Sequence, residues 1–398
     1  MTIENIGKTN CSGCSLCSMV CPKQSITMES DREGFLFPLI NHSTCIDCGL
    51  CYKKCPCNGE KVLEERTPIY YTSAIKDKKE LLNSSSGGNF IAFAKYILSK
   101  GGFICGCIYN QEMKAVHTCT NDIEVVHRMM GSKYVQSDIR CCFDEVKELT
   151  EKGKTVLFTG TACQVAAIKT YIKKQDNLIL VDILCHGVPS PLFFKKYIDF
   201  LERKHNGNVV NVEFRNKKEL GWGSEHRTYY EIEREGKKKG YIPNLPAYFC
   251  SFFWGLNLRE SCYNCKFAGR NRISDITIGD FWGYWTYFHK NFPEGISIAS
   301  VNTEKGKALY KDVKDDMEFC IELPEDKAKG TNTNFYHPTP RPVSRDFFYD
   351  GIESKRYESF RKRTYLDKSC RKKLLKSIYG RFVPEWIKSI LRKGKLGV

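Results

Sequence analysis

The sequence predicts a mixed α/β protein with a small cysteine-rich module at the N-terminus, a larger body built on a mixed sheet, and a basic helical tail. Nine of the 21 cysteines fall between Cys11 and Cys57, and helical and strand patterns alternate through the middle of the chain. Lysine and arginine concentrate near the C-terminus. We expect the boundaries to be 1–62 for the module, 68–150 and 151–330 for the body, and 331–398 for the tail.

Length and composition exclude several classes of protein. The chain has 398 residues, enough for two or three domains with cores of their own. Its 41% hydrophobic and 13% aromatic residues are typical of a packed globular protein and not of a disordered one. The most apolar stretches are short, and Asp182 interrupts the one at 178–185, so no membrane-spanning helix is expected. The first ten residues show no secretory signal, which predicts a cytoplasmic protein.

Two cysteine runs define the N-terminal module. Both follow the spacing C-x2-C-x2-C-x3-C-P, and they consist of Cys11, Cys14, Cys17, Cys21 and of Cys45, Cys48, Cys51, Cys55. In a reducing compartment, such clusters indicate metal or redox chemistry more often than disulfides. Three closely spaced thiolates suit three irons of a cubane, and the cysteine before the proline ligates the other cluster. The runs therefore predict a bacterial ferredoxin-like module with two 4Fe-4S clusters, in which Cys55 completes the first set and Cys21 the second.

Two zinc sites are the alternative for these runs. Structural zinc prefers pairs of C-x2-4-C knuckles with four ligands per ion, so a third close cysteine is hard to place. Between the runs, residues 31–38 have a strand-like apolar pattern that we expect to dock the module on the body. Cys57 is surplus to both sets, and we expect it to be a plain thiol.

The body shows alternating elements. Residues 89–100 have apolar side chains at helical spacing before Gly101, and residues 103–109 read as a strand. The other predicted elements are strands at 155–158, 178–184 and 276–279, helices at 163–174 and 191–205, and an antiparallel pair at 209–215 and 227–235. Alternating strands and helices indicate parallel pairing, and the antiparallel pair makes the predicted sheet mixed.

Six short segments of the body together resemble one family. They are Ser84–Gly88 (SSSGG), Gly131–Ser137 (GSKYVQS), Phe158–Gln164 (FTGTACQ), Cys185–Pro191 (CHGVPSP), Cys262–Phe267 (CYNCKF) and Ser274–Gly283 (SDITIGDFWG). The family is the beta subunit of coenzyme F-420 hydrogenase and dehydrogenase, including bacterial members with a two-cluster ferredoxin domain that occur with polysaccharide biosynthesis genes. The resemblance implies FAD beside iron-sulfur clusters, and makes 68–150 and 151–330 the N-terminal-like and C-terminal-like regions. Ala162 stands where the family usually has proline.

The resemblance also marks flavin-binding candidates, which are Ser84, Ser85, Ser86, Gly87, Gly88, Lys133, Tyr134, Gln136, Gly160 and Thr161. The serine-glycine segment precedes a predicted helix, whose free amides suit a phosphate; simple serine capping is the alternative. Gly160 and Thr161 end a predicted strand, where ligands of α/β sheets bind, although a close-packing turn would look the same. His186 is the catalytic candidate, as a proton carrier or a residue that tunes a cluster; a structural hydrogen bond is the alternative.

Four cysteines inside the family-like segments form a further candidate metal site: Cys163, Cys185, Cys262 and Cys265. Cys163 and Cys185 each follow a predicted strand, so parallel neighbouring strands would bring them to one sheet edge. We expect a third 4Fe-4S cluster next to the flavin, while a zinc knuckle would satisfy the same ligands. We expect the remaining cysteines, Cys105 and Cys119 among them, to be small buried hydrophobic residues.

The charge of the chain is concentrated at its C-terminus. Residues 355–398 hold fifteen lysines and arginines against three acids, which is +12 of the chain's +16. Apolar residues recur there at three and four residues, at Leu374, Leu375, Ile378, Tyr379, Phe382, Trp386, Ile387, Ile390 and Leu391. This pattern suits anionic lipid at the inner face of the membrane, or a docking helix for a partner. Lys266, Arg270 and Arg272 form a smaller basic group, either a patch for an anion or solvated surface. No nucleic-acid module is present.

These features predict an iron-sulfur flavoprotein oxidoreductase. Clusters carry single electrons and a flavin can exchange pairs, so the chain would join a donor or acceptor such as ferredoxin to a two-electron substrate, in either direction. The resemblance suggests a deazaflavin-like substrate or a polysaccharide-pathway metabolite. The alternative is a non-catalytic electron-transfer subunit or docking platform for a partner enzyme, which would hold no flavin.

Overall fold

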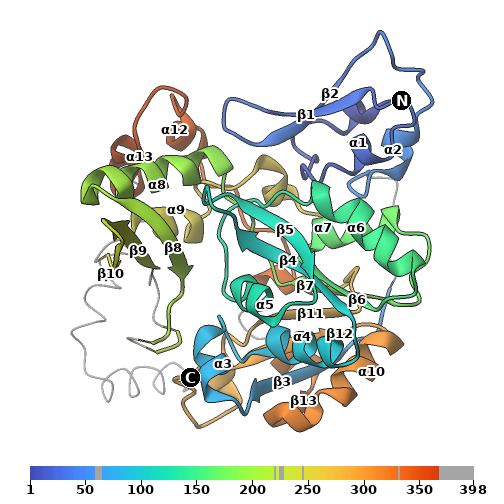
Figure 1. Ribbon diagram of the computed structural model, residues 1–398, viewed down its shortest axis with the longest axis vertical. Helices are drawn as coiled ribbons and strands as arrows, with labels where there is room; N and C mark the ends of the chain where they lie inside the picture. The colour runs from blue at the N-terminus through green and yellow to red at the C-terminus, as the bar shows by residue number, and fades with distance from the viewer. Residues whose placement is uncertain (59–64, 219–220, 224–227, 244–245, 330–331, 367–398) are drawn as a thin grey trace, which may run out of the picture.

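The computed structural model describes residues 1–58, 65–218, 221–223, 228–243, 246–329 and 332–366. An eight-stranded mixed sheet forms the centre of the molecule (Figure 1). In Figure 1 the N-terminal module lies at the upper right, above helices α6 (Arg140–Glu151) and α7 (Ala162–Tyr171). A separate three-stranded sheet lies at the left. Within the described residues, no helix combines the length and the hydropathy that a membrane span requires.

The module contains two short helices and one hairpin. They are α1 (Leu16–Met19), α2 (Leu50–Lys54) and the antiparallel strands β1 (Ile26–Ser30) and β2 (Leu36–Ile40), after the short 3-10 helix η1 (Ile3–Ile6). The hairpin docks on the body as expected. Phe35 at its turn is 1% exposed, and a Cβ on Gly34, which has φ +84°, would collide with Leu192 of the body. Glycine therefore allows the turn to approach the body closely.

The main sheet has the strand order β13-β3-β12-β11-β7-β6-β4-β5. Its strands are β3 (Ile69–Ile75), β4 (Phe103–Tyr109), β5 (Ala115–Thr120), β6 (Val156–Thr161), β7 (Leu178–Ile183), β11 (Ile276–Asp280), β12 (Ser297–Val301) and β13 (Met317–Leu323). Strands β3, β11, β7, β6 and β4 run in one direction, and the other three run against them. The mixed α/β fold class is thus confirmed, although the strand pattern of β3, β5, β12 and β13 was not identified from the sequence.

Helices cover both faces of the main sheet. On one face lie α4 (Asn89–Ser99), α5 (Ile123–Met129) and α10 (Glu304–Asp312), and on the other lie α6 and α7. Successive side chains of β6 explain this arrangement, because Leu157 packs with the first group while Phe158 packs with the second. The short helix α3 (Lys78–Asn83) precedes α4. The predicted helix at 163–174 begins one residue earlier and ends at Tyr171.

The predicted antiparallel pair forms a separate sheet instead of extending the main one. It consists of β8 (Asn208–Phe214), β9 (Thr228–Arg234) and β10 (Lys237–Tyr241). Its apolar face packs on the helices α8 (Pro191–His205), α9 (Ala247–Phe253), α12 (Arg345–Tyr349) and α13 (Tyr357–Leu366). Burial on these helices gives the pair a core of its own, so it needs no partner strand in the main sheet. The remaining short helices are η2 (Glu260–Asn264), η3 (Tyr284–Thr286), η4 (Lys314–Asp316), α11 (Glu325–Lys329) and η5 (Thr333–Phe335).

Part of the segment expected to be a tail belongs to this second core. Phe348 and Phe360 are 1% and 0% exposed, and both pack with α8 and α9. The recurring apolar residues between 374 and 391 lie outside the described residues.

Cys105 and Cys119 form a disulfide, so the expectation that both are free buried thiols is wrong. They face each other directly on the antiparallel strands β4 and β5. Opposite positions on such a pair bring two Cβ atoms close together. Their separation of 14 residues in the sequence does not indicate a disulfide. The pairing depends on the register of two strands, which the sequence patterns do not show.

Candidate functional site

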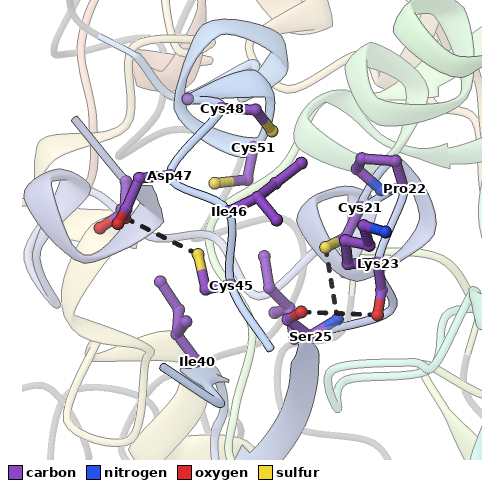
Figure 2. Close-up of a pocket in the computed structure, with 13 residues that line it drawn as sticks. Cys21, Pro22, Lys23, Ser25, Ile40, Cys45, Ile46, Asp47, Cys48 and Cys51 are labelled. Atoms are coloured by element: carbon purple, nitrogen blue, oxygen red, sulfur yellow. Dashed lines mark hydrogen bonds between the residues drawn. The ribbon is translucent and has the colours of Figure 1, made fainter. Parts of the chain in front are cut away.

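The second predicted cysteine set surrounds one cavity of the module. Cys21 lies there with Cys45, Cys48 and Cys51, although it belongs to the other cysteine run (Figure 2). The backbone explains how each run wraps around its site, because left-handed residues at Ser15 and Gly49 turn the chain immediately before α1 and α2. The fourth cysteine of the first run is therefore placed with the first three of the second.

The first set is buried more deeply. Burial raises the pKa of Cys14 to about 12, and the nearby Cys57 and Cys11 add to the effect. The pKa of Cys55 is also raised, first by its hydrogen bond with Cys57 and then by burial, with Cys14 close enough to contribute. Thiols held together in a low-dielectric site resist ionisation unless a metal takes up their charge. The donor set therefore fits a thiolate-bound metal cluster.

The third set meets at the carboxyl edge of the main sheet. Cys163 is the second residue of α7, directly after β6, and Cys185 follows β7. Thr161 and Ile183 are paired in the parallel register of these strands, which brings the two cysteines side by side. Cys262 lies in η2, and a Cβ on Gly187 (φ +133°) would be 3.2 Å from its Cβ. Cys265 follows η2, and Cys265 and Cys163 pack against the same buried cluster.

The electrostatics of these four thiols show their proximity. Burial raises the pKa of Cys262 to about 12, and the next cause is Cys265. Burial also raises the pKa values of Cys163 and Cys185, with Cys265 and Cys262 respectively as the next contributors. Four thiols close together and shielded from water fit either a cubane or a tetrahedral zinc ion.

Cys57 lies between the first and third sets. Hydrogen bonding with Cys55 lowers the pKa of Cys57 to about 6, against the effect of burial, and Ser12 and Lys266 help. Its Sγ lies 3.2 Å from Ser12 Oγ. It also contributes to the raised pKa values of Cys163 and Cys265. The residue that appeared surplus in the sequence thus adjoins two candidate centres.

The serine-glycine candidates lie at the same sheet edge, after β3. Ser85 Oγ and Ser132 Oγ are 2.8 Å apart, which joins this loop to the segment at 131–137. Ser86 Oγ donates to Ile296 O at 2.7 Å, and Gly87 N donates to Ser297 Oγ at 2.8 Å. Ser84 Oγ donates to Glu80 O at 2.9 Å, and Gly88, with φ +89°, caps α4. The loop is therefore held rigidly at the helix N-terminus.

The other flavin candidates face different partners. Lys133 Nζ donates to Met130 O at 2.8 Å at the end of α5, and burial lowers the pKa of this lysine to about 8. Gln136 Nε2 donates to Ser12 O of the module at 2.9 Å. Thr161 caps α7, and its hydroxyl lies 3.2 Å from Cys163 Sγ. Gly160, just before it, is paired with Asp182 on β7. Among these residues, Thr161 thus contacts Cys163 of the third set and Gln136 contacts the module.

His186 lies in an aromatic environment. Its ring centroid is 5.2 Å from that of Phe252, which stacks on Tyr134 at 4.1 Å, so the structure brings two candidates to the same ring. Thr339 Oγ1 lies 3.2 Å from His186 Nδ1 and donates to the histidine carbonyl at 2.6 Å. These contacts fix the ring immediately beyond Cys185.

Lys217 is a candidate that the sequence patterns did not reveal. It is 3% exposed, and its ammonium donates to Ser86 O at 2.8 Å and to Glu294 O at 2.6 Å. Among the described residues no carboxylate lies within ion-pair distance of it. Burial lowers the pKa of Lys217 to about 7. In the sequence it stands beside another lysine, Lys218, and belongs to none of the motifs described above.

The basic group at 266–272 is not one patch. Arg272 is 3% exposed and pairs with Asp182 of β7, which is fully buried, whereas Arg270 pairs with Glu325 on the surface. A buried aspartate in an apolar strand needs a cation and hydrogen bonds, and Ser274 Oγ also donates to it at 2.7 Å. Arg272 Nη1 donates to Phe267 O at 2.8 Å, so this pair also fixes the chain just after Cys265.

Replacing Asp182 with asparagine is expected to lower the free energy of unfolding by about 3 to 5 kcal/mol, because Arg272 would remain buried without its counter-charge. Urea unfolding followed by circular dichroism measures this. Glu148→Gln is the control, since Glu148 forms an exposed pair with Lys152 worth about 0.3 to 0.5 kcal/mol. Equal effects of the two substitutions would contradict the prediction.

Two family models match parts of this chain. Residues 10–58 match the model of a 4Fe-4S dicluster domain, and residues 153–327 match the model of the C terminus of the coenzyme F420 hydrogenase/dehydrogenase beta subunit. A search of curated proteins finds no match. Among solved structures, a chain of the F420-reducing NiFe hydrogenase complex from Methanosarcina barkeri is 18% identical, with a TM-score of 0.45, over 77% of this chain and 94% of that one.

The two matched ranges contain all twelve cysteines of the three sets. The chain is therefore an iron-sulfur protein of the oxidoreductase type, in which residues 10–58 are similar to a 4Fe-4S dicluster domain and residues 153–327 are similar to the C terminus of the coenzyme F420 hydrogenase/dehydrogenase beta subunit.

Proposed function

We propose that this chain passes electrons between two 4Fe-4S clusters in the module and a flavin in the body, through a third centre at the sheet edge. The arrangement of the cysteines supports this most directly. Members of all three sets pack, together with Cys57, into one cluster of buried and partly buried residues that also includes Ile3, Ile6 and Phe267. Centres bound there would lie in sequence from module to body, without a wide stretch of protein between them.

FAD is the proposed second cofactor, at the carboxyl edge of the main sheet. Ligands of open α/β sheets bind at this edge. The serine loop after β3 and the third cysteine set after β7 are three strands apart, or about 14 Å at the usual spacing. An extended dinucleotide can span this distance. When bound, FAD would supply the exchange between single electrons and electron pairs.

The residues of the chain have distinct proposed tasks. Lys217 and the N-terminus of α4 would hold the phosphates of FAD, since a buried ammonium without a carboxylate partner favours an anionic ligand. Tyr134 and Phe252 would exclude water beside the third centre. His186 would hold or move a proton at its Nε2 when a two-electron substrate reacts.

Replacing Lys217 with methionine is expected to weaken FAD binding at least tenfold, because the phosphates would lose their buried cation. Titration of the reconstituted protein with FAD, followed by flavin fluorescence, measures the affinity. Lys218→Met is the matched control, since this neighbouring lysine is exposed. Similar FAD affinities for the two variants would refute the proposed role of Lys217.

One observation favours the alternative, a non-catalytic electron-transfer subunit. The hydroxyls of Ser84, Ser85 and Ser86 already bond to protein groups, so the loop is complete without a ligand. Anaerobic reconstitution with iron, sulfide and FAD, followed by absorption spectroscopy and flavin extraction, separates the two functions. About one flavin per chain, reducible through the clusters, supports the proposal; iron without flavin supports the alternative.

The proposed partner is a small electron carrier such as ferredoxin, which would meet the module near the exposed Cys48. The proposed substrate is a deazaflavin-like molecule or a metabolite of polysaccharide synthesis. The reconstituted protein can be assayed with each of these two substrate classes, once with reduced carrier and once with oxidised carrier. The combination that reacts identifies both the substrate class and the direction of electron flow.

A further inference from the structure

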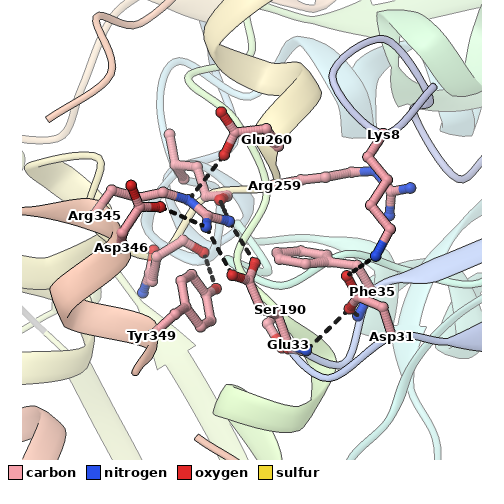
Figure 3. A network of polar contacts seen from close by, with 12 residues as sticks. Lys8, Asp31, Glu33, Phe35, Ser190, Arg259, Glu260, Arg345, Asp346 and Tyr349 are labelled. Atoms are coloured by element: carbon pink, nitrogen blue, oxygen red, sulfur yellow. Dashed lines mark hydrogen bonds and ion pairs between the residues drawn. The ribbon is translucent and has the colours of Figure 1, made fainter. Parts of the chain in front are cut away.

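Arg259 is a buried cation at the contact between module and body. It is 1% exposed and precedes η2 (Figure 3). Its Nε donates to Cys11 O at 2.7 Å, and Nη2 donates to Leu36 O at 2.9 Å. The guanidinium also lies 4.1 Å from the centroid of the Phe37 ring. The cation is thus enclosed by the module.

One of its contacts is a cysteine of the first set. Arg259 Nη2 donates to Cys11 Sγ at 3.6 Å, and Nη1 donates to Gln136 Oε1 at 3.2 Å. On its backbone side, Arg259 O accepts from Cys262 N at 2.9 Å. One residue therefore touches a sulfur of the first set with its side chain and holds a cysteine of the third set with its main chain.

The charge of Arg259 has no protein counter-charge among the residues that the structure describes. No carboxylate there lies within ion-pair distance of its guanidinium. Arg345, which is 3% exposed at the same contact, differs: its Nη1 and Nη2 lie 2.8 and 2.6 Å from the two carboxylate oxygens of Glu33, and its Nε lies 3.4 Å from Glu260. A buried charge without a counter-charge is strongly unfavourable. An anionic group bound beside Arg259 would supply this counter-charge.

We propose that Arg259 is a positioning residue whose cation balances the cluster bound by Cys11, Cys14, Cys17 and Cys55 and raises its reduction potential above that of the other module cluster. The inference rests on the proposed function, because it requires these clusters. A cubane with four thiolates is an anion, and reduction by one electron adds a further negative charge. A cation and an N–H···S bond stabilise the reduced form more than the oxidised form.

The position of this cluster next to the body would make its higher reduction potential favour electron transfer out of the module. Cys57 adjoins the first and the third set, because its Sγ lies 3.2 Å from Ser12 Oγ, next to Cys11, and Lys266, next to Cys265, donates to the carbonyl of Asn58 at 2.8 Å; the second set includes the exposed Cys48. An electron that enters at the outer cluster would move to the cluster beside Arg259, which has the higher potential and lies next to the body. Arg259 would thereby favour transfer from the module toward the third centre.

The test is a redox titration of the reconstituted full chain, followed by paramagnetic resonance. In R259Q, the reduction equilibrium of one module cluster is expected to shift at least tenfold toward the oxidised form, about 59 mV for one electron. The other module cluster should keep its potential. R259K, which retains the charge, should shift less than R259Q. R345Q is the matched control and should leave both potentials unchanged. Unchanged potentials in R259Q, or equal shifts of both clusters, would overturn the inference.

R259K decides the question if R259Q fails to hold its cluster. It keeps the charge but loses the planar fork of hydrogen bonds, so it should lower the potential of the same single cluster. Equal shifts of both module clusters in R259K would count against the inference. Wild-type protein that binds no iron in the module would instead refute the proposed function itself.

Discussion

Cys21→Ser is expected to abolish the cluster of the second cysteine run while leaving that of its own run intact. Cys21 shares a cavity with Cys45, Cys48 and Cys51, and serine is a poor ligand for iron in this setting (Figure 2). The variant should lose about four irons per chain, at four per cubane, and electron transfer through the module should stop.

Paramagnetic resonance and metal analysis of the anaerobically reconstituted variant measure this effect. Cys55→Ser should give the reciprocal result and abolish the other cluster. Cys320→Ser is the control, since Cys320 lies on β13 outside all three sets. Loss of the cluster bound by Cys11, Cys14 and Cys17 in Cys21→Ser would show that the fourth ligands do not cross.

The third centre should depend equally on Cys185. We expect Cys185→Ser to lose about four irons, at four per cubane, and to separate the module clusters from the flavin. The module should still accept electrons, because its two sets do not include residues of the main sheet. Reduction of the flavin by a donor that reacts with the module should become at least a hundredfold slower.

Stopped-flow absorption under anaerobic conditions distinguishes cluster bleaching from flavin bleaching. Cys320→Ser again serves as the control. If flavin reduction keeps its wild-type rate in Cys185→Ser, the third set is not on the electron path. Loss of one zinc, with all irons retained, would assign the set to a structural zinc site.

Patterns of local spacing predicted much of this molecule. The C-x2-C-x2-C-x3-C-P runs indicate the crossed placement, because the proline and the short loops determine it locally. The strands that precede Cys163 and Cys185 were also visible in the sequence, and parallel neighbours bring their carboxyl ends together. The parallel pairing of β6 with β7 places both cysteines at one edge.

Features that depend on tertiary contacts could not be predicted in this way. Arg259 and Lys217 are ordinary basic residues in the sequence, and only packing shows that they are buried without carboxylate partners among the described residues. In the sequence, Arg272 belongs to a basic group that suggests exposure to solvent. In the structure it is buried and pairs with Asp182. The disulfide of Cys105 depends on strand register. Each of these four side chains contacts residues that lie in another segment of the chain.

Metal analysis of the anaerobically reconstituted wild-type chain tests the central claim most directly. Three thiolate sets that bind cubanes predict about twelve irons per chain and no zinc. About eight irons with one zinc would contradict the third centre, and iron-free protein would contradict the whole account.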